Sequence, residues 1–237
     1  MPTFRHGKRT AVFLNATDMS PYLNDATVTR EIEANDTTTF GSTSRSYIVG
    51  MDDGGLSLTG MFDGTANASD AILSGQILQE DSILTVLPEG TAQASRAILA
   101  QGDMTAYEVS MPVADVVAIS SAFQADGGVR QGFNLDLTTR TASGTASSVD
   151  FASTMSNGAI FHLHVTSNTN GSATTFKVQD SSNNSSFSDV ATFASVNGSA
   201  TTSERVVVTT SVNRYLRTVA TTAGTAAYSY NISAARR

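Results

Sequence analysis

Short runs in which apolar and polar residues alternate recur along almost the whole chain, and turns rich in Gly, Asn, Asp and Ser separate them. The alternation is clearest in "AYEVSMPV" and "GFNLDLTT", which begin at Ala106 and Gly132. Because successive side chains of a strand point to opposite faces, this pattern predicts strands with one buried face. Charged residues make up only 15% of the chain, which leaves little material for long, solvated helices. The sequence therefore predicts a mainly β protein.

The first part of the chain is expected to be a largely antiparallel β domain. Adjacent Asp and Gly residues supply the positive φ angles that tight hairpins need, and they predict two hairpin turns. One turn consists of Asp52, Asp53, Gly54 and Gly55, and the other is Asp126–Gly128. A polar loop is expected at 35–45. The expected strands are 10–15, 26–34, 46–49, 56–62, 82–87, 97–100, 105–113, 116–125 and 129–137.

One helix is expected within "TANASDAILSGQILQED", 65–81. Asn67 or Ser69 is a candidate N-cap, and Asp70 adds a negative charge in the first turn, where the helix dipole favours it. Apolar residues from Ala68 to Leu78 can share one face of this helix. The helix is expected to pack against the β domain.

The segment 141–148 is small, polar and contains glycine, and it is the expected linker between two domains. Residues 1–140 hold 8 Lys and Arg against 17 Asp and Glu, and residues 141–237 hold 6 against 4. This asymmetry supports the division. Beyond the linker, residues 149–237 contain short strands at about ten-residue spacing, which predicts a small all-β sandwich.

The composition excludes several classes of site. The chain has no cysteine, so disulfides, thiolate nucleophiles and zinc–thiolate centres are absent. No apolar run approaches about 18 residues, so no transmembrane helix and no membrane insertion are expected. The acidic first part disfavours tight binding of a phosphate backbone, which needs clustered Lys and Arg.

Three constellations deserve a chemical reading, and each has a simpler structural one. Asp52 and Asp53 lack the further oxygen ligands of a calcium loop, and a turn explains them better. His162 and His164 lie on one face of a strand and so could share a metal, but a solvent-facing or interfacial strand is favoured. "VNRYLRTV", 212–219, is either a carbohydrate or phosphate contact or, more simply, a strand with arginine stems over apolar surface. No enzyme, no metal and no cofactor are therefore expected.

Two segments resemble the N-terminal half of major tail tube proteins of long-tailed bacteriophages. They are "FRHGKRTAVFLNATDMSPYLND", which begins at Phe4, and "TTTFGSTSRSYIVGMDDGGLSLTGMFDG", which begins at Thr37. The order of elements is similar: a short strand, a "YLND" segment, a Thr-rich loop, a glycine-bounded segment ending in "FDG", and a helix. The C-terminal part, from "GAIFHLHVTSNTNG" onward, is similar to the β module often attached in such proteins.

The resemblance implies a tail-tube β-sandwich or half-barrel with one packed helix in residues 1–140, and a C-terminal sandwich module on the outer wall. It also implies a homohexameric ring that stacks into a hollow tube, through which genomic DNA passes without specific binding. Tape measure, tail terminator and distal tail proteins would be its partners. The location would be the virion tail, assembled in the host bacterial cytoplasm. The loop between subunits and rings would comprise Thr37, Thr38, Thr39, Phe40, Gly41, Ser42, Thr43 and Ser44.

Two other readings of the whole chain stay open at this point. The first is a different virion component, such as a capsid decoration protein or a tail-tip adhesin. The second is a carbohydrate-binding β module, although the absence of tryptophan, a frequent sugar-stacking residue, counts mildly against it.

Overall fold

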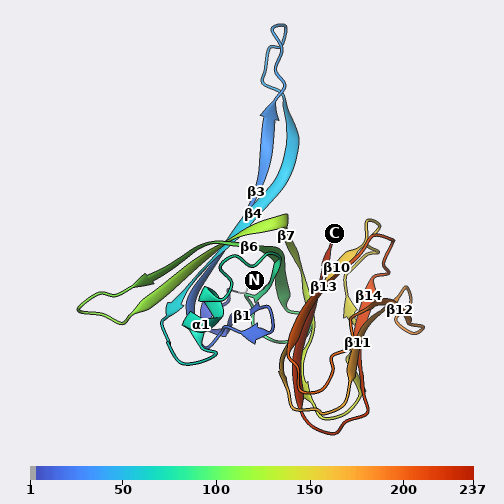
Figure 1. The fold of residues 1–237 in the computed structure, drawn as a ribbon. Helices are drawn as coiled ribbons and strands as arrows, with labels where there is room; N and C mark the ends of the chain where they lie inside the picture. The colour runs from blue at the N-terminus through green and yellow to red at the C-terminus, as the bar shows by residue number, and fades with distance from the viewer. Residues whose placement is uncertain (1–3) are drawn as a thin grey trace. The chain divides into compact units, whose positions relative to one another are not determined.

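The computed structural model describes residues 4–237, so the first three residues of the predicted 1–140 domain lie outside it. Strands make up 57% of the chain and helices 4%, which confirms the mainly β prediction (Figure 1). Within the described residues, no helix is long and apolar enough to cross a membrane.

The elements follow in chain order from an N-terminal 3-10 turn to a C-terminal strand. The first part contains η1 (Gly7–Arg9), β1 (Ala11–Leu14), β2 (Thr17–Asp18), β3 (Leu23–Asp36), β4 (Tyr47–Met61), α1 (Ser69–Ser74), β5 (Ser82–Leu87), β6 (Arg96–Ser110) and β7 (Ala118–Arg140). The second contains β8 (Gly144–Thr145), β9 (Val149–Asp150), β10 (Ala159–Asn168), β11 (Thr174–Ser181), β12 (Ser188–Thr192), β13 (Thr202–Val208), β14 (Tyr215–Thr222) and β15 (Tyr228–Arg236).

The chain packs as two compact units, and they do not follow the boundary expected at 141–148. Unit 1 comprises 1–21, 83–99 and 130–237, and unit 2 comprises 22–82 and 100–129. Strands β6 and β7 each run through both units. The segment expected as a linker contains β8, which pairs with β14 through Val219↔Thr145. Gly144 and Thr145, in the middle of this segment, are therefore part of a sheet of unit 1.

Unit 1 contains the sandwich predicted for the C-terminal part. One layer is the strand run β13-β10-β15-β7, and the other is β12-β11-β14-β8. Alternate residues of β10 and β15, such as Phe161 and Tyr230, enter a common core with Phe176 and Leu216 of the second layer. Leu135 of β7 belongs to the same core. The sandwich therefore needs β7 as well as residues 149–237.

The first layer of the sandwich also belongs to a half-barrel. Its opposite face packs against β1, β5 and the start of β6, where Phe13, Leu87 and Leu99 meet Ile160 and Ala235. β1 pairs with β5 in antiparallel register from Ala11↔Leu87 to Leu14↔Leu84. Side chains on both faces of β10 and β15 are consequently buried, which explains their near-continuous burial.

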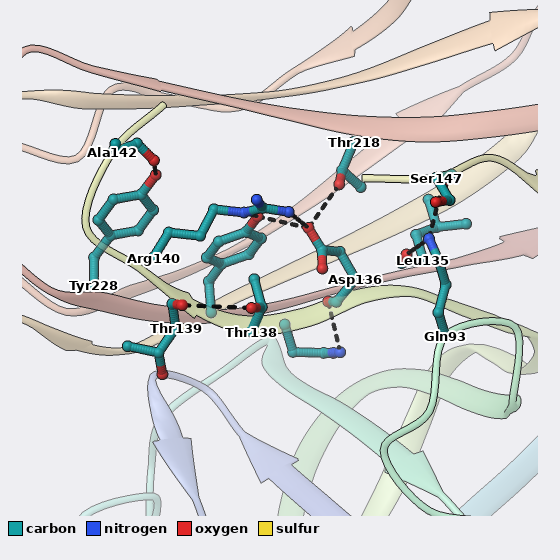
Figure 2. Close-up of polar contacts among 12 residues, drawn as sticks. Gln93, Leu135, Asp136, Thr138, Thr139, Arg140, Ala142, Ser147, Thr218 and Tyr228 are labelled. Carbon is teal, nitrogen blue, oxygen red and sulfur yellow. Dashed lines mark hydrogen bonds and ion pairs between the residues drawn. The ribbon is translucent and has the colours of Figure 1, made fainter. Parts of the chain in front are cut away.

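A buried polar cluster ties the two layers of the sandwich together (Figure 2). The Asp136 carboxylate accepts hydrogen bonds from Arg140 (3.0 Å), Thr218 (3.0 Å) and Tyr230 (2.6 Å). Burial, with the nearby Asp136 charge, raises the pKa of Tyr230, so its hydroxyl stays a donor. Tyr228 donates to the carbonyl oxygen of Ala142 (2.7 Å). The end of β7 and the segment after it are thus held by satisfied, mostly buried bonds.

Unit 2 is built on a sheet with the strand order β3-β4-β7-β6. β3 and β4 form a long antiparallel hairpin, and β4 pairs on its other side with β7 from Gly55↔Gln124 to Met61↔Ala118. Leu56 and Leu58 of β4 and Ile119 and Phe123 of β7 form the buried face.

The helix predicted over 65–81 is much shorter, because α1 covers only Ser69–Ser74. Ala68 is the N-cap and contributes no side-chain bond, whereas the Ser69 hydroxyl donates to the Met61 carbonyl instead. Gly75 ends the helix, and Leu78 takes a positive φ of 67°. A left-handed residue cannot continue a right-handed helix, so the apolar pattern after Gly75 lies in turns.

The prediction of a hairpin turn at Asp126–Gly128 is also wrong, because β7 runs without a break from Ala118 to Arg140. Gly127 and Gly128 have the expected positive φ angles, 71° and 75°. They mark an irregularity within one strand. Before it β7 pairs with β4, and from Gly132 onward it pairs with β15. The glycines allow the strand to change partners.

Candidate assembly surface

The prediction of a hairpin turn at 52–55 is wrong, because these aspartates and glycines form no turn. All four residues lie within β4, and they pair with β3 through Ile32↔Asp52, Glu31↔Asp53, Arg30↔Gly54 and Thr29↔Gly55. The chain reverses instead at 37–46, between the end of β3 and the start of β4.

Gly54 and Gly55 are required because neighbouring strands approach closely on both sides of β4. A Cβ atom on Gly54 would lie 2.6 Å from the Thr29 carbonyl oxygen and 2.7 Å from Val129 Cγ2. On Gly55 it would lie 2.9 Å from the Phe123 carbonyl oxygen. Glycine in a strand interior marks such an approach as often as it marks a turn, which is why the sequence pattern misled.

The predicted bridging residues Thr37 to Ser44 form most of the hairpin tip, and all of them are exposed. The tip is closed by its own bonds: the Thr37 amide donates to the Ser46 carbonyl (2.8 Å), and the Ser46 amide donates to the Thr38 hydroxyl (3.0 Å). Hydrogen bonds from Thr38 lower the pKa of the exposed Asp36 carboxyl. Phe40 lies at the tip with its ring in solvent. The loop is thus a folded projection that offers an apolar ring.

Apolar side chains recur on the outer part of this hairpin, on the side that continues from the buried face of unit 2. Residues on alternate positions share a face, so Ile32 lies on the side of β3 that carries the half-buried Val28, and the Arg30–Asp52 ion pair lies on the same side. Ala34 and Asp36 follow, opposite Val49 and Tyr47. We call Ile32, Ala34, Tyr47 and Val49 the apolar arm face. Ile32 is 54% exposed and Val49 is 79% exposed.

The turn of the other hairpin of unit 2, between β6 and β7, is also apolar and exposed. Met111, Val113 and Val116 are each exposed to at least half of their full area. Monomeric proteins rarely present such contiguous apolar groups, which usually mark interfaces. Both hairpins thus have the surface chemistry of a contact between chains.

The opposite face of the unit 2 sheet is polar and carries no cation. Glu31 and Asp53 lie directly across from each other, although like charges in that position destabilise a sheet. Asp53 accepts a hydrogen bond from the Gln124 side chain (2.5 Å). We call this surface the acidic–hydroxyl face; the register places on it Asp25, Thr27, Thr29, Glu31, Asp53, Ser57, Thr59, Ser120 and Gln124.

The charges of the chain separate by unit more sharply than by position in the sequence. Unit 2 has 2 Lys and Arg against 14 Asp and Glu, a net charge of −12, and unit 1 has 12 against 7, a net charge of +5. The formal charge of −7 therefore hides two surfaces of opposite sign.

The sheet of unit 2 has an open edge on each side in the described part of the chain. β3, which is 14 residues long, pairs only with β4. On the far side, the neighbour of β6 is β5, whose 6 residues cannot cover the 15 residues of β6. An open strand edge presents unpaired backbone N–H and C=O groups, which are a template for pairing with another chain.

The two histidines on β10 are buried, contrary to the expected solvent-facing or interfacial strand. The His164 Nδ1 lies 2.6 Å from the carbonyl oxygen of Asn15, so this nitrogen donates and the neutral ring accepts at Nε2. The Thr85 hydroxyl lies 2.8 Å from His164 Nε2 and 3.1 Å from His162 Nδ1. Phe13 stacks on the His164 ring. No group of three or more metal-ligating residues exists among residues 4–237.

Burial disfavours the charged form of both rings. Burial, with the nearby His164 and Arg205, holds the pKa of His162 well below its usual value, and burial lowers the pKa of His164 to about 4. The pair is therefore a neutral structural contact between β10 and the strands β1 and β5 at neutral pH.

No family model matches the sequence, and no curated protein matches it either. Several solved structures align with about half of the chain. They include the tail of an empty gene transfer agent particle with C6 symmetry, at 15% identity over 53% of this chain and 97% of the other, with a TM-score of 0.42. The cap that terminates the anti-feeding prophage tube is 12% identical over 56% and 93%, with a TM-score of 0.47.

The SPP1 tail tube aligns at 12% identity over 56% of this chain and 81% of the other, with a TM-score of 0.45. These three structures come from tails or tubes.

The buried histidines predict a loss of stability in mild acid. A histidine whose pKa is depressed on folding binds fewer protons than in the unfolded chain, so stability falls as pH drops from about 6.5 toward about 4. From His164 alone, we expect the free energy of unfolding to fall by roughly 2 kcal/mol between about pH 7.5 and about pH 5. Urea titrations at the two pH values measure this change.

His164→Gln should remove that part of the pH dependence, whatever its stability at neutral pH. His6→Gln, which changes an exposed histidine, is the control and should keep the wild-type dependence. Equal pH dependence in wild type and His164→Gln would show that the ring does not become charged on unfolding.

Proposed function

We propose that this chain is a structural subunit, without enzymatic activity, that self-assembles into hexameric rings and that these rings stack into the hollow tail tube of a bacteriophage. The observation that carries the proposal is the sheet of unit 2, which has two open edges, one acidic–hydroxyl face and the exposed apolar arm face. The open edges and the exposed apolar side chains are liabilities for a monomer, and assembly relieves them. The hexamer is inferred from the sequence resemblance.

Ring closure would use the two open edges. The sheet is antiparallel from β3 to β4 and from β4 to β7, and the β7–β6 hairpin keeps this alternation. β6 therefore runs antiparallel to β3, and β6 of one subunit would meet β3 of the next in antiparallel order. Repetition around a ring closes a continuous barrel, which leaves no edge.

The apolar arm face and the hairpin tip would then contact a neighbouring subunit. Ile32, Val49 and Phe40 gain most from burial because they are strongly exposed in the single chain. The loop Thr37 to Ser44 is proposed to bridge to neighbouring subunits and rings, as the resemblance implies.

The acidic–hydroxyl face would line the lumen. DNA carries dense negative charge, so a wall of carboxylates and hydroxyls without cations repels the phosphates and lets the duplex slide. The cross-strand pair Glu31 and Asp53 costs some folding stability, and lumen charge gives that cost a function. Genomic DNA would thus pass without specific binding.

The remaining parts of the proposal rest on the resemblance. The C-terminal sandwich, residues 149–237 together with the end of β7, would lie on the outer wall of the tube. Tape measure, tail terminator and distal tail proteins would be the other partners. Assembly would take place in the host bacterial cytoplasm and end in the virion tail.

The open edge of β3 predicts a specific effect of proline at adjacent positions. Of two neighbouring residues in an antiparallel edge strand, one directs its N–H toward the paired strand and the other directs it outward. Thr29→Pro and Arg30→Pro should therefore have different effects on stability and on assembly. The variant with the inward N–H loses stability, and the other stays folded but forms no rings or tubes.

Thr29→Ala and Arg30→Ala control for the lost side chains and should still assemble. Thermal melting measures stability, and negative-stain microscopy measures assembly. Normal tubes from both proline variants would refute edge pairing. Monomers or trimers of the wild type under every salt condition would instead favour a decoration protein or an adhesin.

Shortening the hairpin tip tests the bridging role of the loop. Deletion of Thr37 to Ser44, combined with Arg45→Asn and Ser46→Gly, leaves a two-residue turn that suits a tight hairpin. Because the loop bonds mainly to itself, we expect a folded protein that no longer grows tubes. Phe40→Ser is a milder variant, which should slow growth. Tubes of normal length from the deletion would exclude the bridging role.

Charge reversal on the acidic–hydroxyl face tests its place in the lumen. Tubes of Glu31→Lys with Asp53→Lys should retain DNA, and the retention should weaken as salt increases. Glu108→Lys with Asp115→Lys makes the same change of charge on the exposed β6–β7 hairpin. Co-sedimentation of DNA with tubes at low and high salt compares them. Equal retention by both variants would mean that 31 and 53 do not line the channel.

A further inference from the structure

The outward face of the smaller sheet in unit 1 holds one guanidinium in an unusual setting. β14 pairs with β11, and the register places Arg217 opposite Gln179 and Tyr215 opposite Ser181. The neighbouring residues Leu216 and Thr218 point into the sandwich core. Arg217 therefore lies near the middle of the exposed face, between β12 on one side and β8 and β9 on the other.

Arg217 is fixed in place without a carboxylate. Its Nε and Nη2 donate to the Gln179 side-chain oxygen at 2.9 and 2.7 Å, and its Cζ lies 3.9 Å from the centre of the Phe187 ring. Gln179 is itself oriented, because its Nε2 donates to Asp189 at 2.7 Å. One edge of the guanidinium is thus used, and the Nη1–Nη2 end retains its donors.

The other charges on this face neutralise one another. Lys177 pairs with Asp189 at 2.6 Å, and Arg214 forms a two-bond pair with Asp150 at 2.5 and 2.8 Å. In the described part of the chain, no carboxylate pairs with Arg217. A rigid, half-buried cation therefore stands between two ion pairs, in a unit with a net charge of +5.

This arrangement favours a carboxylate as the ligand group. The two terminal nitrogens of a guanidinium form a fork that matches the two oxygens of a carboxylate. Holding the fork in advance removes most of the entropy that a free arginine would lose on binding.

The surroundings favour a sugar chain over a protein segment. The core of a protein–protein interface is depleted of charged residues, whereas this face carries Arg217 between two ion pairs and no strongly exposed large hydrophobic residue lies on β8, β9, β11, β12 or β14. The half-buried rings of Tyr215 and Phe187 each have an arginine over one face, Arg214 at 4.7 Å and Arg217 at 3.9 Å. Flat rings therefore lie beside polar groups on this surface. Such surfaces suit a flat, hydroxylated ligand.

We propose that the outward face of β11, β12 and β14 binds a carboxylate-bearing polysaccharide, with Arg217 as the residue that holds the carboxylate. This site does not depend on the proposed tube, since every residue of it belongs to unit 1. Binding by an unassembled chain and by a tube would both satisfy it.

The full-length protein is titrated with polygalacturonate, with neutral dextran and with polyglutamate. We expect binding to polygalacturonate but not to dextran, and affinity at least about tenfold weaker in Arg217→Gln, since charge-assisted bonds are lost. Arg217→Lys should also bind weakly because it keeps the charge and loses the fork. Gln179→Glu should weaken binding as well, since it supplies an internal carboxylate to Arg217.

Arg5→Gln removes the same charge from an exposed site elsewhere and should bind as the wild type does. Thermal melting confirms that the Arg217 and Gln179 variants are folded. Equal affinity of wild type and Arg217→Gln for polygalacturonate would overturn the site. Equal or tighter binding of polyglutamate would overturn the choice of a sugar chain. Equal binding of dextran would overturn the carboxylate as the group that the site recognises. Tube formation by the same variants is measured separately by microscopy. A negative result for polysaccharide binding therefore does not bear on the tube proposal.

Discussion

Unpaired backbone groups at the edges of the unit 2 sheet constrain the rest of that unit. β3 extends for 14 residues with a partner on one side only, so its outer N–H and C=O groups must bond to water or to another chain. Proteins that remain monomeric usually shorten such edges or protect them with bulges, prolines or charges. β3 carries charged side chains, and register shifts interrupt its pairing with β4 at Leu23/Asp25 and at Ile32/Ala34. Between these shifts the pairing is regular and no proline interrupts β3, so this stretch of its outer edge remains available for pairing.

The two faces of the same sheet differ in character. One face buries Leu56 and Phe123 and continues outward, past the Arg30–Asp52 ion pair, to apolar side chains, and the other carries Glu31 and Asp53 with hydroxyl groups around them. A sheet that merely needed solubility would mix both signs of charge on its polar face. Unit 2 has only 2 cations against 14 acids. That excess of like charge costs folding stability through self-repulsion, and the proposed lumen would give it a function.

The sequence was sufficient for the fold class and for most strands of the sandwich, because period-2 alternation and polar turns reflect local geometry. The sequence alone did not show whether a pair of glycines forms a turn or lies inside a strand. Gly54 and Gly55 looked like a turn, but their role depends on Thr29 and Phe123, which are distant in sequence and close in space. Gly127 and Gly128 have turn-like angles within a continuous strand. The helix was overestimated because its apolar spacing continues past Gly75 into left-handed positions.

The same limit applied to the candidate sites. The H-x-H spacing placed His162 and His164 on one face of a strand, but only the curvature of the half-barrel brings Thr85 and Phe13 over that face. At the Arg217 site, the segment 212–219 was singled out from the sequence because it contains Tyr215 and Arg217. Its partners Gln179 and Phe187 are distant in the sequence, so no sequence pattern indicated them.

Strand β7 gives the two units a shared element with separate tasks. Its first half pairs with β4 in the acidic sheet, and its second half contributes Leu135 and Asp136 to the sandwich. Because one strand belongs to both cores, the sandwich cannot be regarded as an appendage joined by a flexible linker. The buried bonds of Asp136 and Tyr228 hold the residues after β7 as well. One continuous strand therefore contributes to the cores of both units, and the irregularity at Gly127 and Gly128 lies close to the point where it passes from one to the other.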